Sequence, residues 1–279
     1  MTQPGNSSET FPCAIGIAGA GAMVRMFVCA FATVAVPPRI QLWARNASAA
    51  QSVARENGRS KILPLTMLAQ AMEIVILATP AIAYREILEW MAPALNPQTI
   101  IVSLSNAMAI EEIEDLLPNP VVKVIPTIAH KLKRGVSIIV AGTRADEQAV
   151  AKIHCMMRAI STPVIAQDSD CRALSNLAGS GLAIAAEFAR LCVSANECAL
   201  SFVDREMLDA IMAETFSAVA ALYAGGRSFE AIIAETAVPG GMTEAAITML
   251  RRDRCIVIEA MMQETFRRQA FLRMRNLQA

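Results

Sequence analysis

A glycine-rich turn near the N-terminus limits the folds open to this chain more than any other feature. The segment Cys13–Met23 begins with a short apolar, β-branched run and ends in closely spaced glycines. The apolar residues 24–35 follow and predict a helix. Glycine lets the backbone approach a ligand closely, and the start of a helix offers N–H groups and a positive dipole end to an anion. The order strand, glycine turn, helix therefore predicts a dinucleotide pyrophosphate site, although a plain strand-to-helix turn packed with small residues has the same pattern.

The spacing of the glycines is close to the dinucleotide pattern G-x-G-x-x-G. Gly19 and Gly21 take its first two positions, and Val24 stands at the third. We expect the residues of this turn to contact the cofactor: Gly16, Gly19, Ala20, Gly21, Ala22 and Met23.

The chain after this turn alternates between two kinds of segment as far as residue 167. Apolar, β-branched runs predict strands at 39–43, 61–65, 73–79, 99–104, 121–125, 135–140 and 163–166. Amphipathic segments predict helices at 48–57, 81–91, 110–117 and 145–160. Buried strands separated by helices are typical of a parallel sheet covered on both faces, so we expect an α/β, Rossmann-type domain.

Strand signals stop at about Asp168, and only helical patterns follow. We expect helices at 171–200, 204–224, 228–236, 242–251 and 254–274. The chain is therefore predicted to hold a dinucleotide-binding domain at 13–167 and an all-α domain at 168–279. Residues 1–12 are polar, lack the features of a signal peptide, and are expected to form a disordered tail.

Two further stretches fall where a dinucleotide would lie. The residue after the second strand of such a fold meets the adenosine ribose, where an acid favours NAD and an arginine accommodates the 2′-phosphate of NADP. Here Arg45 and Asn46 follow the strand without an acid, which favours NADP over NAD, although Arg45 also fits an ordinary surface position. Ala78, Thr79 and Pro80 end the strand at 73–79 and either line the cofactor cleft or simply end that strand.

Composition excludes several classes of function. The chain has 25 basic and 25 acidic residues, so a nucleic-acid surface is not expected. Apolar residues make up 54% of it, yet no run approaches the roughly 18 apolar residues of a membrane span, so we expect a large core or a subunit interface. The 7 cysteines form no C-x-x-C and only 2 histidines occur, which argues against a metal site or a disulfide framework. We expect a cytoplasmic protein without a metal.

The order of motifs resembles one family, the pyrroline-5-carboxylate reductases, from about Ala14 to Phe266. The family's G-x-x-G-x-G-x-M matches Gly16 to Met23, its N-R-S loosely matches 45–48, and its A-V-K-P corresponds to 77–80. Its S-G-S-G-P-A-Y corresponds to 178–184, its V-I-E-A to 257–260, and its most specific motif, S-P-G-G-x-T, to 238–243.

The resemblance implies a reductase that transfers hydride from NADPH to the C=N bond of a small cyclic imine acid, with pyrroline-5-carboxylate and proline as the leading pair. It implies a homodimer or larger homo-oligomer, and a hydroxyl of Thr243 directed at the ring nitrogen. The glycines of the Pro-Gly-Gly turn permit close backbone approach, and the following helix start suits a substrate carboxylate. The implied substrate-binding residues are Gly179, Ser180, Gly181, Pro239, Gly240, Gly241, Met242 and Thr243.

Several positions depart from the family motifs. Val238 and Met242 replace a serine and a hydroxyl residue, and Leu182 and Ile184 replace a proline and a tyrosine. The family's M-P-N-T-P-A falls on 125–130, where it ends in His130 beside several basic residues. A histidine there is either a proton donor or anion ligand, or a solvated loop residue.

Three alternatives remain at this stage. One is an imine reductase of the same fold with a different substrate. Another is a hydroxyacid dehydrogenase of a related class, which normally uses a lysine of the helical domain, but 171–200 and 204–224 contain no lysine. The third is a non-catalytic, nucleotide-binding regulatory protein.

Overall fold

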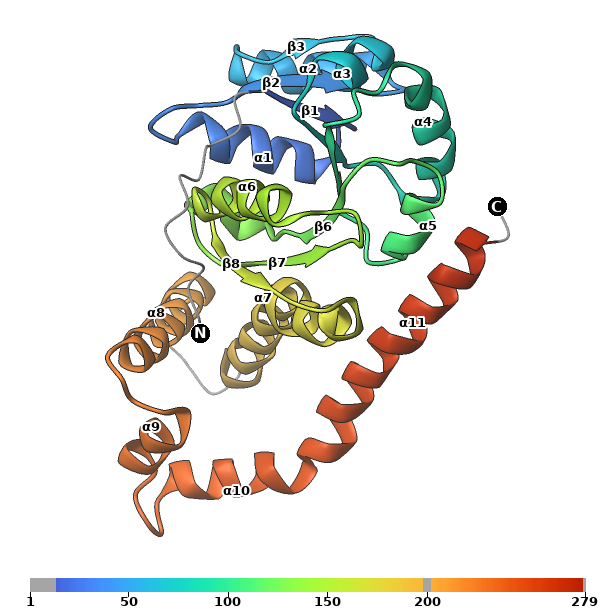
Figure 1. Cartoon of the computed structure of the whole chain (residues 1–279). Coiled ribbons are helices and arrows are strands. Elements are labelled where there is room, and N and C mark those ends of the chain that lie inside the picture. The colour runs from blue at the N-terminus through green and yellow to red at the C-terminus, as the bar shows by residue number, and fades with distance from the viewer. Residues whose placement is uncertain (1–13, 198–201, 278–279) are drawn as a thin grey trace. The chain divides into compact units, whose positions relative to one another are not determined.

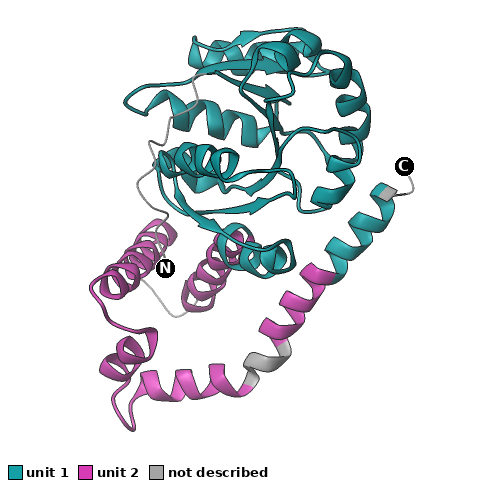
Figure 2. Cartoon of the chain, viewed as in Figure 1, with its two compact units in different colours: residues 1–179, 267–279 teal, residues 180–266 magenta. Residues whose placement is uncertain are grey.

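The computed structural model describes residues 14–197 and 202–277 and divides them between two compact units (Figures 1 and 2). The first unit is discontinuous: it contains the chain up to Gly179 and again from Arg267. The second unit is Ser180–Phe266. The expected boundary after residue 167 lies at the beginning of helix α7 (Asp168–Glu197), whereas the two compact units divide inside this helix, between Gly179 and Ser180. The tail expected at 1–12 lies outside the described residues.

The first unit is built on one eight-stranded sheet in the order β3-β2-β1-β4-β5-β6-β7-β8. The strands are β1 (Ala14–Ala18), β2 (Arg39–Trp43), β3 (Lys61–Ile62), β4 (Ile74–Leu77), β5 (Ile100–Ser103), β6 (Val121–Ile125), β7 (Val136–Ala141) and β8 (Thr162–Ile165). The expectation of a fully parallel sheet is wrong at one place, because β6 and β7 pair antiparallel. The connection between them is too short for the helical crossover that a parallel pair needs.

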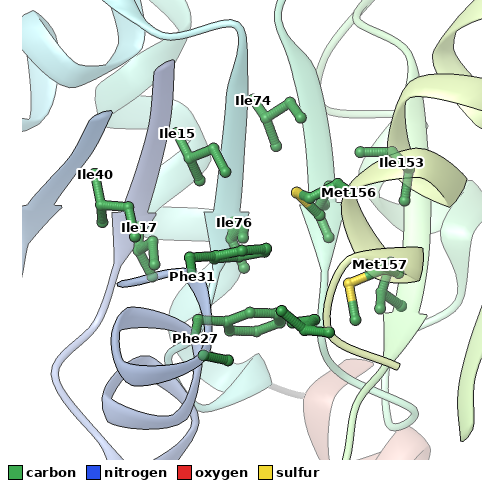
Figure 3. Packing of buried hydrophobic residues seen from close by; sticks show 14 of the residues in the cluster. Ile15, Ile17, Phe27, Phe31, Ile40, Ile74, Ile76, Ile153, Met156 and Met157 are labelled. Atoms are coloured by element: carbon green, nitrogen blue, oxygen red, sulfur yellow. The ribbon is translucent and has the colours of Figure 1, made fainter. Parts of the chain in front are cut away.

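Helices cover both faces of this sheet, as the strand pattern predicted. They are α1 (Ala22–Ala32), α2 (Ala47–Asn57), α3 (Leu65–Ala71), α4 (Tyr84–Met91), α5 (Ile110–Glu114) and α6 (Glu147–Arg158). Side chains of α1, α2 and α6 join one core cluster, and those of α3, α4 and α5 join another. In the first cluster the stacked rings of Phe27 and Phe31, 5.7 Å apart, lie near the strand residues Ile15, Ile17 and Ile76 (Figure 3).

Helix α3 is an element that the sequence patterns did not predict. It begins at Leu65, the last residue of the strand expected at 61–65, and β3 has only two residues. Pro64 precedes the helix, and Leu65, Leu68 and Ala69 are buried at a spacing that suits a helix. The segment is too short for this periodicity to be conspicuous in the sequence.

The second unit contains helices only, in agreement with the predicted all-α domain. The chain passes through α7 (Asp168–Glu197), α8 (Arg205–Ala224), α9 (Phe229–Thr236), α10 (Met242–Arg254), a π-helical segment (Cys255–Glu259) and α11 (Ala260–Leu277). None of the residues of α8 or α9 is buried within this chain. By length and composition alone, α7 and α8 could each cross a membrane, with a mean hydropathy of 1.3 over their most apolar stretch.

Candidate functional site

The glycine turn lies at the switch point of the sheet, where strand order reverses between β1 and β4. Ligands of open α/β sheets bind outside the carboxyl ends of the strands at such a point. The loops after these strands touch, because the Ala78 N–H donates to the Ala18 carbonyl over 2.8 Å. Gly19 has φ +143°, and a Cβ there would lie 2.5 Å from the Ala78 carbonyl oxygen. Only glycine fits this position.

The next glycine opens the start of helix α1 to a ligand. Gly21 is the N-cap of α1, no side chain caps the helix, and its first turn has no acidic residue. A Cβ at Gly21 would meet nothing within 4 Å. Gly21 and Ala22 are exposed, and Ala20 and Met23 are half-buried. An uncapped helix start with open space before it suits a phosphate group.

Gly16 has a different role from the one the sequence suggested. It lies inside β1 and is buried, away from the helix start. A Cβ at this position would lie 2.6 Å from the side chain of Leu68 and 2.9 Å from that of Met72. Gly16 therefore allows α3 to pack closely on the sheet, and we leave it out of the ligand site.

The end of β2 carries both residues that were expected to meet the adenosine ribose. The Arg45 guanidinium forms an ion pair with Glu86 of helix α4. Asn46 caps α2, because its Oδ1 accepts from the Ala49 N–H over 3.2 Å. Nothing in the local sequence links Arg45 with Glu86, 41 residues away.

The loop after β4 contains an unused hydroxyl. Among the described residues, the buried Thr79 Oγ1 has no hydrogen-bond partner. The strand end before it is held by Tyr84, whose buried hydroxyl donates to the Leu77 carbonyl over 2.7 Å. Burial raises the pKa of Tyr84 to about 12, so this phenol stays a donor. A buried hydroxyl beside the switch point is suited to bind a polar ligand group there.

His130 is neither a proton donor nor a solvated loop residue. It is fully buried, and both ring nitrogens bond within its own loop: Nε2 accepts from the Thr127 N–H over 3.1 Å, and Nδ1 donates to the Arg134 carbonyl over 2.9 Å. Burial lowers the pKa of His130, which favours the neutral ring that this arrangement requires. The His130 ring holds the loop after β6 together through these two hydrogen bonds. The catalytic role expected for His130 is therefore not supported.

A polar network, which the sequence did not reveal, fixes the helices that enter and leave the first unit. Asn106, in the loop after β5, donates to the Ser175 hydroxyl of α7 over 3.2 Å and accepts from Gln269 of α11 over 3.1 Å. The fully buried Lys123 of β6 pairs with Asp168 at the beginning of α7 over 2.5 Å. Because these partners are distant in sequence, no local pattern announces them.

The glycines expected to bind substrate are split between the two units. Gly179 and Gly181 lie inside α7, where a Cβ at Gly179 would meet nothing within 4 Å, and Ser180 stands between them. The Pro239–Gly241 turn precedes α10 in the second unit. Among the described residues we find no cluster of metal-binding side chains.

The Pro-Gly-Gly segment forms a hydrogen-bonded turn just before α10. Gly240 has φ +74°, and the Gly241 N–H donates back to the Val238 carbonyl over 2.9 Å. The Gly240 N–H is taken by the Glu244 carboxylate over 2.7 Å. Thr243 is exposed in the first turn of α10. The turn is therefore formed, but one of its N–H groups already binds an internal carboxylate.

The comparisons with known proteins agree with this arrangement. Residues 15–146 match the ketopantoate reductase PanE/ApbA family, and residues 168–271 match the pyrroline-5-carboxylate reductase dimerisation domain. ComE operon protein 4 of Bacillus subtilis (strain 168) is 25% identical over 204 residues, which cover 72% of this chain and 69% of that protein.

Solved structures share the fold over nearly the whole chain. A pyrroline-5-carboxylate reductase from Coxiella burnetii has a TM-score of 0.82 at 20% identity and covers 94% of this chain and 98% of its own. The pyrroline carboxylate reductase of Plasmodium falciparum with NADP bound has a TM-score of 0.81 at 14% identity, covering 94% and 98%.

These findings define the class first: a Rossmann-type oxidoreductase fold followed by a helical dimerisation domain. Within this class, residues 168–271 match the pyrroline-5-carboxylate reductase dimerisation domain, and the fold is the one that solved pyrroline-5-carboxylate reductases have. The resemblance inferred from the motifs agrees with this domain match and with the shared fold.

Proposed function

We propose that this protein is an NADPH-dependent reductase of the C=N bond of a small cyclic imine acid, with pyrroline-5-carboxylate as substrate and proline as product. The observation that carries the proposal is the match of residues 168–271 to the pyrroline-5-carboxylate reductase dimerisation domain, which contains the Pro239–Thr243 turn. The open glycine turn of the first unit supports it independently.

The residues at the switch point fit a dinucleotide. The open space at Gly21 and the uncapped start of α1 suit a pyrophosphate, held by the backbone of 19–23. Thr79, with its unused hydroxyl between Ala78 and Pro80, would bind a polar group of the cofactor. Arg45 and Asn46 would lie at the adenosine ribose, and Arg45 favours NADPH over NADH. When bound, NADPH would supply the hydride for the C=N carbon.

The second unit would supply the contacts to substrate. The start of α10 is suited to a carboxylate, although the Glu244 carboxylate already engages the Gly240 N–H. Thr243 would donate its exposed hydroxyl to the ring nitrogen as that nitrogen gains charge. Pro239, Gly241 and Met242 complete this turn, and the Gly179–Gly181 segment of α7 would contribute further contacts.

The exposed apolar surface of the second unit supports a homodimer or larger homo-oligomer. Helix α8 has no buried residue within this chain, and its large apolar side chains lie in the open: Met207, Ile211 and Tyr223 are each more than half exposed. A surface of this kind normally meets a partner, and a second copy of the dimerisation domain accounts for it. We assign the same role, rather than membrane insertion, to the apolar stretches of α7 and α8. A soluble homo-oligomer is consistent with a cytoplasmic location, and no surface for nucleic acid is part of the proposal.

Steady-state kinetics with pyrroline-5-carboxylate and NADPH test the proposal. Thr243→Ala should lower kcat about ten- to a hundred-fold, because a hydrogen bond to a charged group contributes about 1.5–3 kcal/mol. Thr248→Ala, on the same helix and also exposed, is the matched control and should leave kcat unchanged. Wild-type turnover by Thr243→Ala would remove Thr243 from the reaction, and absence of turnover by the wild type would refute the substrate.

A second candidate is reduction of a different, more apolar imine. Val238 and Met242 flank the turn and are 67% and 92% exposed, where the family motif carries hydroxyl residues. Loss of polar contacts changes substrate specificity strongly. NADPH oxidation with apolar cyclic imines but not with pyrroline-5-carboxylate would favour this candidate, and NADPH binding without any turnover would favour a regulatory protein.

A further inference from the structure

Helix α4 packs one of its faces against the end of β2. The rings of Trp43, the last residue of β2, and Trp90 of α4 meet edge to face with centroids 6.5 Å apart. Glu86 lies four residues before Trp90, so the two share a face of the helix. On this face Glu86 forms its ion pair with Arg45. The aromatic contact therefore fixes the part of α4 that places a carboxylate beside Arg45.

This contact lies where the proposed dinucleotide would put its adenosine ribose. Trp43 is the register partner of Ala18, and the Gly19 N–H donates to the Trp43 carbonyl over 2.7 Å. The end of β2 is thus joined directly to the glycine turn. In folds of this kind an acid beside the ribose binds its hydroxyls and favours NAD, whereas an arginine binds the 2′-phosphate of NADP. Here both charges are present, and the acid comes from α4 instead of β2.

We propose that Glu86 is a positioning residue that sets how strongly the site distinguishes NADPH from NADH, an inference that rests on the proposed dinucleotide function. Glu86 holds the Arg45 guanidinium in the free protein, so a 2′-phosphate has to share or displace this partner. Its negative charge also opposes a phosphate and can accept a hydrogen bond from a ribose hydroxyl. Both effects reduce the preference for NADPH that Arg45 alone would give.

The ion pair is exposed enough for a ligand to compete with it. The side chains of Arg45 and Glu86 are 62% and 46% exposed. Exposed pairs contribute little, so Glu86 modulates binding of the phosphate and does not prevent it. The guanidinium has several N–H donors and can turn from the carboxylate to a phosphate.

Calorimetric titration of NADPH and NADH into the wild type and Glu86→Gln tests the proposal. Glu86→Gln should raise the ratio of NADPH to NADH affinity about three- to ten-fold, since loss of the pair and loss of repulsion act together. Glu89→Gln removes the same charge from the same helix at an exposed position and should leave the ratio unchanged. Thermal unfolding of each variant checks that the fold is kept.

A double-mutant cycle shows whether Glu86 acts through Arg45. In an Arg45→Ala background only the direct effect of the Glu86 charge on the cofactor remains, so Glu86→Gln should change the affinity ratio less than it does in the wild type. An unchanged ratio in Glu86→Gln, or an equal change in both backgrounds, would overturn the role proposed for Glu86 while leaving the dinucleotide site intact. Failure of the wild type to bind either cofactor would refute the proposed function and this inference together.

Discussion

Two glycines of the same turn should respond oppositely to the same substitution. Gly21→Ala adds a methyl group to open space at φ −83°, a conformation that alanine adopts. Gly19→Ala adds one at φ +143°, 2.5 Å from the Ala78 carbonyl oxygen, where the backbone has to move. The first change should affect binding alone, and the second should affect the fold.

The magnitudes follow from these surroundings. Gly21→Ala should alter the free energy of unfolding by less than about 1 kcal/mol, because a small N-cap penalty opposes a gain in chain entropy. Its methyl group would occupy the space assigned to the pyrophosphate and weaken NADPH binding about ten- to a hundred-fold, the value of one charge-assisted hydrogen bond. Gly19→Ala should lose about 3 kcal/mol of stability through backbone strain and steric overlap.

Thermal unfolding and calorimetric titration of NADPH, carried out on both variants, separate the two effects. Gly21→Ala should unfold at nearly the wild-type temperature, and Gly19→Ala roughly 6–12 °C lower. Wild-type NADPH affinity in Gly21→Ala would show that the pyrophosphate does not lie at this turn. Wild-type stability in Gly19→Ala would contradict the close approach of the loops after β1 and β4.

Three other predictions concern stability and assembly. Asp168→Asn leaves the buried Lys123 ammonium without its acid and should lower the free energy of unfolding, measured in urea, by about 3–5 kcal/mol. Lys123→Met should lower it less, because Asp168 is partly exposed and retains Arg273. Equal losses in the two variants would refute this. Burial lowers the pKa of His130 in the folded state, so protonation favours unfolding, and stability should fall as the pH drops below about 6.5, by at most about 1.4 kcal/mol per pH unit. His130→Gln should weaken the pH dependence of the free energy of unfolding between pH 7 and pH 5. If the variant keeps the wild-type pH dependence, other titratable groups cause it. Light scattering at micromolar concentration should give a dimer or larger oligomer, and a stable monomer would leave the exposed face of α8 unexplained.

The sequence predicted most elements of the fold because their signals are local. Strand β4, Ile-Val-Ile-Leu, is buried on both sides, and such a run between turn residues has few other interpretations. The direction of β7 was not predictable in this way, because the pattern within a strand does not encode its partner's direction. Helix α3 escaped notice because seven residues show too little periodicity.

For the candidate site, the sequence could predict backbone features, such as turns that need glycine, but not the roles of side chains. The glycine requirement at Gly19 depends on local conformation, which the spacing of the glycines indicates, and Gly21 follows from the same spacing. His130 was misjudged because its side chain binds the Thr127 and Arg134 backbone groups. Neither these hydrogen bonds nor the burial of the ring can be read from the sequence. Gly16 was likewise assigned to a ligand when it makes room for α3.

Two internal carboxylates show why binding groups and their availability have to be judged separately. Arg45 and the Gly240 N–H are the kinds of group that bind anions, and the motifs place both in the candidate site. In the fold, Glu86 engages the first and Glu244 engages the second, each within its own unit. Both contacts are exposed and hence weak, so an anionic ligand can compete with them. We expect an internal carboxylate of this kind to lower affinity and tune selectivity without closing the site. The carboxylate on the Gly240 N–H comes from the same turn of sequence, whereas the one on Arg45 comes from 41 residues away and is apparent only in the fold.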